Sequence, residues 1–150
     1  SIVGFLMYNL GILGDRTVFL GDNGSNSLGF LCAWVLIYFS NIENAVISPV
    51  TALWLVAIPF VDAVGVIISR ILNKLKVLNS YRDHIHHKML SKGFSEELVF
   101  SILVLLSGLL AFIGLYFNKN FPDQSFYSFY AFIVFWLCYY LIVKRLSDNV

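Results

Sequence analysis

Long uncharged runs alternate with short polar segments along this 150-residue chain. A helix that crosses a membrane needs about 20 mostly apolar residues. Residues 2–13 are apolar but too short to span, which indicates the end of a helix that starts before this chain. Longer apolar runs predict four further transmembrane helices. The first begins at Ser27 and reaches the polar patch at residues 41–44, and the other three cover residues 45–68, 98–117 and 126–143. The predicted fold is all-α: a polytopic helical membrane protein with four full spans and the end of a fifth.

Composition supports this assignment to the membrane. Apolar residues make up 59% of the chain and charged residues 13%, with a mean hydropathy of +0.79. Soluble domains carry about 25% charged residues, and nothing in the sequence indicates nucleic acid as a partner. Because Ser1 is not an initiator methionine and the first helix lacks its beginning, we expect residues 1–150 to be the C-terminal part of one integral-membrane domain.

The ten lysines and arginines fall unevenly on the two sides that these helices define. Nine of them share the side that holds the loops at residues 14–26 and 69–96, and Lys119 lies on the other side. Cytoplasmic loops of membrane proteins are rich in Lys and Arg. We therefore predict that both loops are cytoplasmic, in a multi-pass protein of the inner (cytoplasmic) membrane.

The loop at residues 69–96 concentrates the candidate chemistry, with six of the ten cations and all three histidines of the chain. Fixed positive charges and imidazole N–H donors together suit a polyanion such as a phosphate ester. If this segment is helical, one face carries His84, His87 and Lys88, and another carries Arg82 with His86.

Two other interpretations of this loop stay open. A zinc site competes, although no Cys or Glu lies nearby to complete four ligands. The loop also suits a purely topological role, in which its cations contact lipid headgroups.

A second polar group precedes the first complete run. Gly21 and Gly24 let the backbone turn tightly or approach a ligand, and Ser25 or Ser27 is expected to cap the next helix. Asp22 supplies a hard oxygen ligand, and Mg²⁺ is usually held by one or two carboxylates together with substrate phosphates. The alternative is an ordinary turn with a solvated aspartate.

Two further polar residues lie in or beside apolar runs. Asp62 is an ionisable group inside a predicted span, which makes it a functional candidate. Arg70, eight residues later, or a neighbouring helix offers Asp62 a structural partner instead. Asn9 lies near the end of the truncated first helix, where it either caps that helix or points into a site.

Four short segments resemble, in order and spacing, signatures of the polyprenyl-phosphate N-acetylhexosamine-1-phosphate transferases. They are GFLMYN at residues 4–9, VFLGDNGS at 18–25, PFVD at 59–62 and HIHH at 84–87. The interrupted histidine pattern resembles the branch that uses UDP-N-acetylglucosamine or a related HexNAc, the undecaprenyl-phosphate N-acetylglucosaminyl-1-phosphate transferase-like branch. The peptidoglycan branch, which takes UDP-MurNAc-pentapeptide, more often has three consecutive histidines and is the alternative.

The resemblance implies transfer of a sugar-1-phosphate from a UDP-sugar to a membrane polyprenyl phosphate, with release of UMP. It also implies Mg²⁺ or Mn²⁺ with Asp22 as a ligand, and a histidine loop that lies over the active site and contacts the nucleotide sugar. Expected partners are UDP-N-acetylhexosamine, polyprenyl phosphate, membrane lipid and a second copy of the chain. The candidate catalytic residues are Asp22, His84, His86 and His87, and the candidate substrate-binding residues are Asn9, Gly24, Ser25, Arg70 and Arg82.

One departure from the family limits this expectation. The family's N-terminal half contributes a paired aspartate motif with a nearby lysine and a further Asn/Asp-rich motif, and this chain contains neither. Phosphoryl transfer depends on positioning and electrostatic stabilisation, so the chain alone is expected to be inactive. Two other classes stay open: a transporter piece in which Asp62 lines a pathway, and a non-catalytic membrane adaptor whose basic loop binds anionic lipid.

Overall fold

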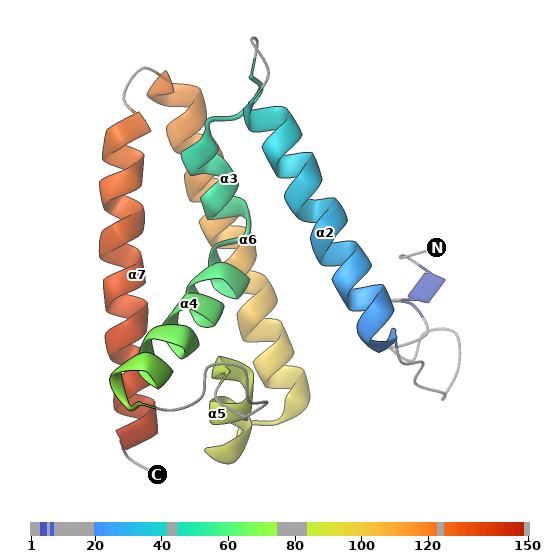
Figure 1. The fold of residues 1–150 in the computed structure, drawn as a ribbon, viewed down its shortest axis with the longest axis vertical. Helices are drawn as coiled ribbons and strands as arrows, with labels where there is room; N and C mark the ends of the chain where they lie inside the picture. Colours follow the sequence, from blue (N-terminus) through green and yellow to red (C-terminus); the bar gives the residue numbers. More distant parts are fainter. Residues whose placement is uncertain are drawn as a thin grey trace. The chain divides into compact units, whose positions relative to one another are not determined.

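The computed structural model describes residues 4, 5, 7, 20–41, 45–74, 84–122 and 125–148. The described residues are almost entirely helical and contain no strand, which confirms the all-α prediction. They fall in two compact units, residues 1–38 and 39–150, which are considered separately. The longer elements are α2 (Gly21–Ser40), α3 (Pro49–Leu55), α4 (Ala57–Leu72), α5 (Ile85–Ser91), α6 (Glu96–Asn120) and α7 (Ser125–Asp148) (Figure 1).

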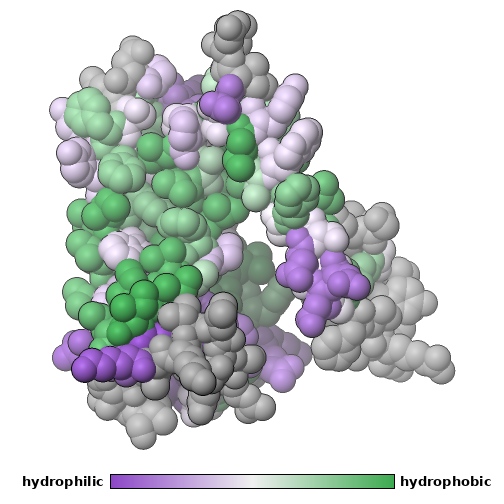
Figure 2. Space-filling view, in the orientation of Figure 1, coloured by the Kyte–Doolittle hydropathy of each residue, from purple (hydrophilic) through white to green (hydrophobic). Residues whose placement is uncertain are grey.

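The two C-terminal helices match two of the predicted spans. Both α6 and α7 are long and apolar enough to cross a membrane. Their outward-facing side chains remain hydrophobic, with Leu105, Phe112 and Tyr130 exposed by 74%, 67% and 64%. In residues 39–150, hydrophobic side chains cover the middle of the helices and hydrophilic ones gather toward the ends (Figure 2). These features indicate a membrane protein.

The other two predicted spans differ from the expectation. Residues 45–68 do not form one straight helix, because α3 and α4 meet at an angle of 85°. The helix α2 has sufficient length, but its polar first turns, with Asn23 and Asn26, keep it below the hydropathy of a spanning helix. The described residues therefore contain two candidate spans, or three if the bent pair crosses as one, and the predicted count of four is not confirmed.

The bend between α3 and α4 has a cause in the sequence. Proline lacks a backbone N–H, and its ring clashes with the carbonyl four residues earlier in a continuous helix. For Pro59 that carbonyl belongs to Leu55, which is the last residue of α3. A new helix starts after Val56, whose carbonyl accepts a hydrogen bond from Phe60 N–H at 3.0 Å. Pro59 then lies in the first turn of α4, where a missing N–H costs little.

The core of residues 39–150 forms where α3 and α4 pack against α6 and α7. Trp54 is 3% exposed, donates its indole N–H to Ser128 Oγ at 3.0 Å and meets Phe132 edge-on. Its side chain lies so close to α6 that a Cβ at Gly114 would overlap the Trp54 Cβ. The other buried hydrophobic residues of this core are Ala57, Ile58, Val61 and Leu110.

Adding one methyl group at this contact should separate the helices. We expect Gly114→Ala to lower the free energy of unfolding by about 1–3 kcal/mol, since overpacking a close contact forces the backbone to move. The matched control is Gly108→Ala on the same helix, where a Cβ would meet nothing within 4 Å. That change should be neutral or stabilising, because alanine favours a helix over glycine by about 1 kcal/mol. Thermal unfolding in detergent compares the two variants, and equal stabilities would contradict the close α3–α6 approach.

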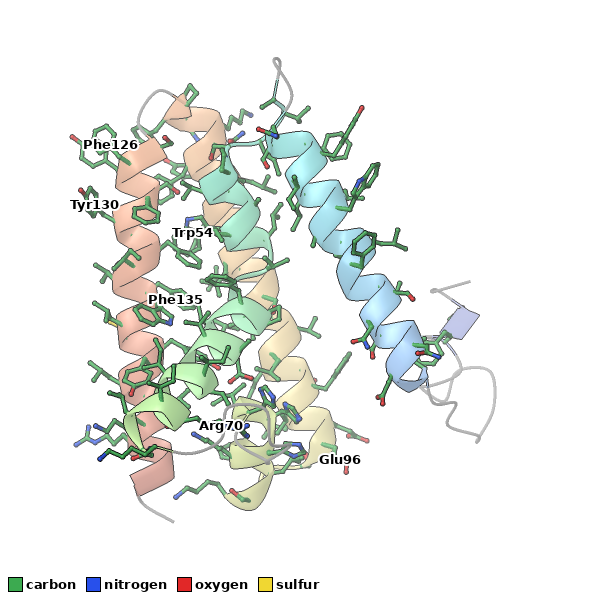
Figure 3. The ribbon with its side chains drawn as sticks, viewed as in Figure 1. Trp54, Arg70, Glu96, Phe126, Tyr130 and Phe135 are labelled. Carbon is green, nitrogen blue, oxygen red and sulfur yellow. The ribbon has the colours of Figure 1, made fainter. Side chains whose placement is uncertain are left out.

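Residues 39–150 have one markedly basic end. Because α6 runs away from Glu96 and α7 returns antiparallel to it, the end of α4, the short α5, the start of α6 and the end of α7 gather together (Figures 1 and 3). Lys119, near the last turn of α6, lies at the opposite end. We call the end that holds α5 and the start of α6 the basic end. Its described cations are Arg70, Lys74, Lys88, Lys92, Lys144 and Arg145.

Candidate active site at the basic end

The short helix α5 carries two of the three histidines and begins directly after the third. His84 has an extended backbone (ψ 151°) and acts as the N-cap residue, while its carbonyl accepts a hydrogen bond from Lys88 N–H at 3.2 Å. Its side chain does not cap the helix. The N-terminal N–H groups of α5 therefore need a partner from another element.

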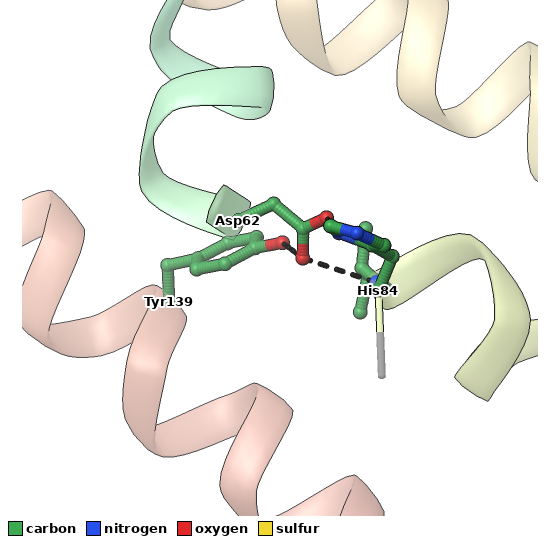
Figure 4. A network of polar contacts seen from close by, with 4 residues as sticks. Asp62, His84 and Tyr139 are labelled. Atoms are coloured by element: carbon green, nitrogen blue, oxygen red, sulfur yellow. Dashed lines mark hydrogen bonds and ion pairs between the residues drawn. The ribbon is translucent and has the colours of Figure 1, made fainter. Parts of the chain in front are cut away.

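That partner is Asp62 of α4. Its Oδ1 accepts hydrogen bonds from the Ile85 backbone N–H and from the Tyr139 hydroxyl, both at 3.0 Å. Its Oδ2 lies 2.8 Å from His84 Nδ1 (Figure 4). The Asp62 side chain is 11% exposed and that of His84 is 45% exposed. One buried carboxylate thus joins α4, α5 and α7, and it leaves the imidazole of His84 partly open to solvent.

The three imidazoles form one group. The ring of His86 stacks on that of His84 at 5.9 Å between centroids and lies 4.1 Å from that of His87. The predicted separation of His86 from His84 and His87 is therefore wrong, because the ring of His86 meets both other rings. His84 lies before the helix, so the helical repeat does not govern its side chain. The predicted pairing of His86 with Arg82 lies outside the described residues.

The charge state of the central histidine follows from this packing. Burial lowers the pKa of His86 below 6.5, and so do the neighbouring imidazoles of His87 and His84, against a smaller opposing effect of Asp62. At neutral pH His86 is therefore an uncharged ring that offers one N–H donor and one acceptor. The cluster combines directional donors with the fixed charges of the basic end, and this combination suits phosphate oxygens.

The residues predicted around Asp22 lie in the other unit, at the start of α2. Asp22 is in the first turn of the helix and is exposed. Gly24 has little room for a side chain, since a Cβ there would come within 2.7 Å of Leu20 Cγ. Gly21 has a φ of +69°, a conformation that glycine adopts readily.

The predicted capping role of the serines is wrong. The helix α2 already begins at Gly21, so Ser25 and Ser27 both lie inside it. Their hydroxyls donate back to the carbonyls of Asp22 and Asn23, at 3.1 and 2.7 Å. The predicted loop at residues 14–26 is accordingly helical from Gly21 onward.

Of the remaining candidates, the structure describes only Arg70. Arg70 lies in the last turn of α4 and is 7% exposed, so it is buried within its unit. Asn9 and Arg82 lie outside the described residues. Among the residues that the structure describes, no three His, Cys, Asp or Glu side chains are grouped to hold a metal ion.

Sequence comparison identifies relatives of this chain. A protein of Escherichia coli O157:H7 named undecaprenyl-phosphate alpha-N-acetylglucosaminyl 1-phosphate transferase is 36% identical over 97% of this chain. Proteins of the same name from Yersinia pestis and Haemophilus influenzae are 33% and 34% identical over 97% and 95% of the chain. The chain is homologous to these transferases. It spans about two-fifths of their length, 40% to 41%, which is consistent with the predicted C-terminal half. No protein-family model and no solved structure matches the chain.

Sequence reasoning missed Tyr139 as a member of the site. Its hydroxyl meets Asp62, which lies 77 positions earlier in the chain. In the sequence it is one of several aromatic residues in an apolar run, where a membrane-interface role is the usual interpretation. The sequence did single out Asp62, as an acid within a predicted span. It also left open a structural partner on a neighbouring helix, and the contact with Tyr139 agrees with that alternative.

Proposed function

We propose that this chain forms the C-terminal part of an enzyme that transfers HexNAc-1-phosphate from a UDP-HexNAc to undecaprenyl phosphate or a similar polyprenyl phosphate. An oxygen of the lipid phosphate attacks the phosphorus that bears the sugar. The bond from that phosphorus to the bridging oxygen breaks, and UMP leaves with the electron pair. The product is a polyprenyl diphosphate sugar.

The main support is homology along almost the whole chain to proteins whose names state transfer of an N-acetylglucosaminyl 1-phosphate group and include undecaprenyl phosphate. The grouping of three imidazoles among the cations of the basic end adds a physical reason. A UDP-sugar brings a diphosphate, and the acceptor brings another phosphate to the same place. Mutual repulsion opposes their meeting, so a catalyst must supply compensating charge and directed donors.

Each candidate residue receives a role in this proposal. His84, His86 and His87, with Arg82, donate to the diphosphate of the nucleotide sugar. Arg70 adds positive potential from within the basic end. The other candidates, Asn9, Gly24 and Ser25, belong to the substrate-binding part that includes the start of α2.

A Mg²⁺ or Mn²⁺ ion is part of the proposal, with Asp22 as a ligand. An exposed carboxylate in the first turn of α2 has the oxygen chemistry that Mg²⁺ prefers. In this proposal, substrate phosphates and further carboxylates complete the coordination of the ion. When bound, such an ion neutralises charge on phosphate oxygens.

The same reasoning extends to placement in the membrane. We propose four full spans, with the basic end in the cytoplasm beside the inner membrane, and a homodimer as the assembly. The uneven distribution of cations supports the orientation.

With Cys32 and Cys138 replaced by serine, a Lys92→Cys variant should react with an impermeant thiol reagent only after cells are opened. A Lys119→Cys variant should react in intact cells, and the reverse pattern would invert the orientation.

The activity itself is tested with the purified full-length protein in lipid nanodiscs. Undecaprenyl phosphate, Mg²⁺ and UDP-N-acetylglucosamine should together give UMP and a lipid-linked diphosphate sugar in equal amounts. Omitting the lipid phosphate should abolish UMP release, and residues 1–150 alone should give none. Turnover of UDP-MurNAc-pentapeptide but not of any UDP-HexNAc would favour the peptidoglycan-type reaction, and no turnover of either would overturn the proposal.

A further inference from the structure

The buried contact between Asp62 and His84 has a consequence for the histidine cluster. An ionised carboxylate only accepts hydrogen bonds. Its Oδ1 already receives the Ile85 N–H and the Tyr139 hydroxyl, and its Oδ2 faces His84 Nδ1 at 2.8 Å. In this arrangement Nδ1 of His84 must carry the hydrogen.

We infer that Asp62 is a positioning residue that fixes the tautomer and the ring orientation of His84. With Nδ1–H committed to Asp62, the other ring nitrogen, Nε2, is left for a ligand at the half-exposed side of the imidazole. When neutral, His84 accepts a proton or hydrogen bond at Nε2. When protonated, it donates from Nε2 to a phosphate oxygen while Asp62 stabilises the imidazolium. This inference rests on the proposed function for its role in turnover, but its structural part stands independently.

Tyr139 has a supporting part in this arrangement. Its hydroxyl and the Ile85 N–H both occupy Oδ1, so the carboxylate is held with Oδ2 toward the histidine. The same two contacts fix α5 against α4 and α7. Because His86 stacks on His84, the orientation imposed on one ring is passed to the next.

Replacing Asp62 by asparagine should reverse the tautomer. The Ile85 N–H requires an acceptor, so the amide oxygen of asparagine is expected to stay on that side. The amide NH₂ then faces His84 and donates to Nδ1, which leaves the hydrogen on Nε2. The substitution preserves size, and it changes the protonation pattern of the ring more than the packing.

The tautomer is measured by ¹⁵N NMR of histidine-labelled full-length protein in nanodiscs, at a pH of about 8.5, where an ordinary imidazole is neutral. Single His84→Gln, His86→Gln and His87→Gln variants assign the signals of these three histidines in the full-length protein. The parent protein should show Nδ1 of His84 protonated, and the Asp62→Asn variant should show Nε2 protonated. A parent with hydrogen on Nε2, or an unchanged tautomer in the variant, would overturn the inference.

Activity supplies the second readout. Asp62→Asn should lower kcat about 10- to 100-fold, as is typical when a partner that orients a functional histidine is lost, with a smaller change in KM. Tyr139→Phe should keep the tautomer and lower kcat by less than about tenfold, since it removes one neutral hydrogen bond. Glu97→Gln, an exposed acid-to-amide change in α6, is the control and should resemble the parent.

The two proposals fail in different ways. A parent that shows the expected tautomer but forms no lipid-linked sugar would contradict the proposed function and leave the structural assignment intact. An active parent whose Asp62→Asn variant has the reversed tautomer and a normal kcat would show that His84 tautomer does not matter for turnover, and the positioning role would be rejected.

Discussion

Asp22→Asn in the full-length protein is expected to lower the proposed transfer activity about a hundredfold or more, comparable to the loss of a key electrostatic stabiliser. The amide keeps the size and hydrogen-bonding capacity of the side chain but loses its negative charge. A neutral oxygen is a much weaker ligand for Mg²⁺ than a carboxylate. The assay is UMP release across a Mg²⁺ titration, and a partial recovery at high Mg²⁺ would fit a weakened metal site.

A control is needed because Asp22 also lies in the first turn of α2, where an acidic side chain stabilises a helix through its dipole. Glu96→Gln removes an acidic side chain from the equivalent place in another helix, the first turn of α6. If the effect of Asp22→Asn came from the helix terminus, both variants would lose activity to a similar extent. Near-normal turnover of Asp22→Asn at saturating Mg²⁺ would exclude Asp22 as an essential ligand.

The sequence predicted the helices that hydropathy alone defines and missed features that depend on local backbone geometry. The runs behind α6 and α7 are continuous, and the helices follow them closely. The break after Leu55 leaves no trace in the hydropathy pattern. Pro59 removes one backbone hydrogen bond but lies within a continuous apolar run. The start of α2 at Gly21 likewise could not be predicted from hydropathy, because residues 21–26 are polar or glycine and precede the apolar run.

The candidate site shows the same division between composition and geometry. That His84, His86 and His87 lie in one cation-rich segment could be predicted from order along the chain. Their mutual contacts could not, since His84 precedes α5 and escapes its helical repeat. The contact with Asp62 joins residues 22 positions apart, and it depends on how α5 docks against the bent α4. Periodicity within one segment carries no information about such docking.

Single alanine replacements of the histidines are the second large test. We expect His84→Ala, His86→Ala and His87→Ala in the full-length protein each to reduce the proposed UMP release by about 10- to 100-fold or more, since a positioned imidazole typically contributes 10²–10⁴-fold where it handles a proton. A ring that only binds the diphosphate should raise KM for the UDP-sugar, whereas a ring that acts in the transition state should lower kcat.

The structure ranks the three variants by the contacts that each one removes. His84→Ala removes one of the three hydrogen-bond partners of Asp62 and the stacking surface of His86, so its effect should be the largest. His86→Ala removes the central ring, which the lowered pKa keeps neutral at pH 7, so it should affect directed hydrogen bonding more than charge. Ser91→Ala tests simple disturbance of α5, because its exposed hydroxyl bonds only the Lys88 carbonyl among the described contacts. That variant should behave like the parent. If all three histidine variants bind UDP-sugar and turn over like the parent, the basic end sets membrane topology, and the assignment of a substrate site there is wrong.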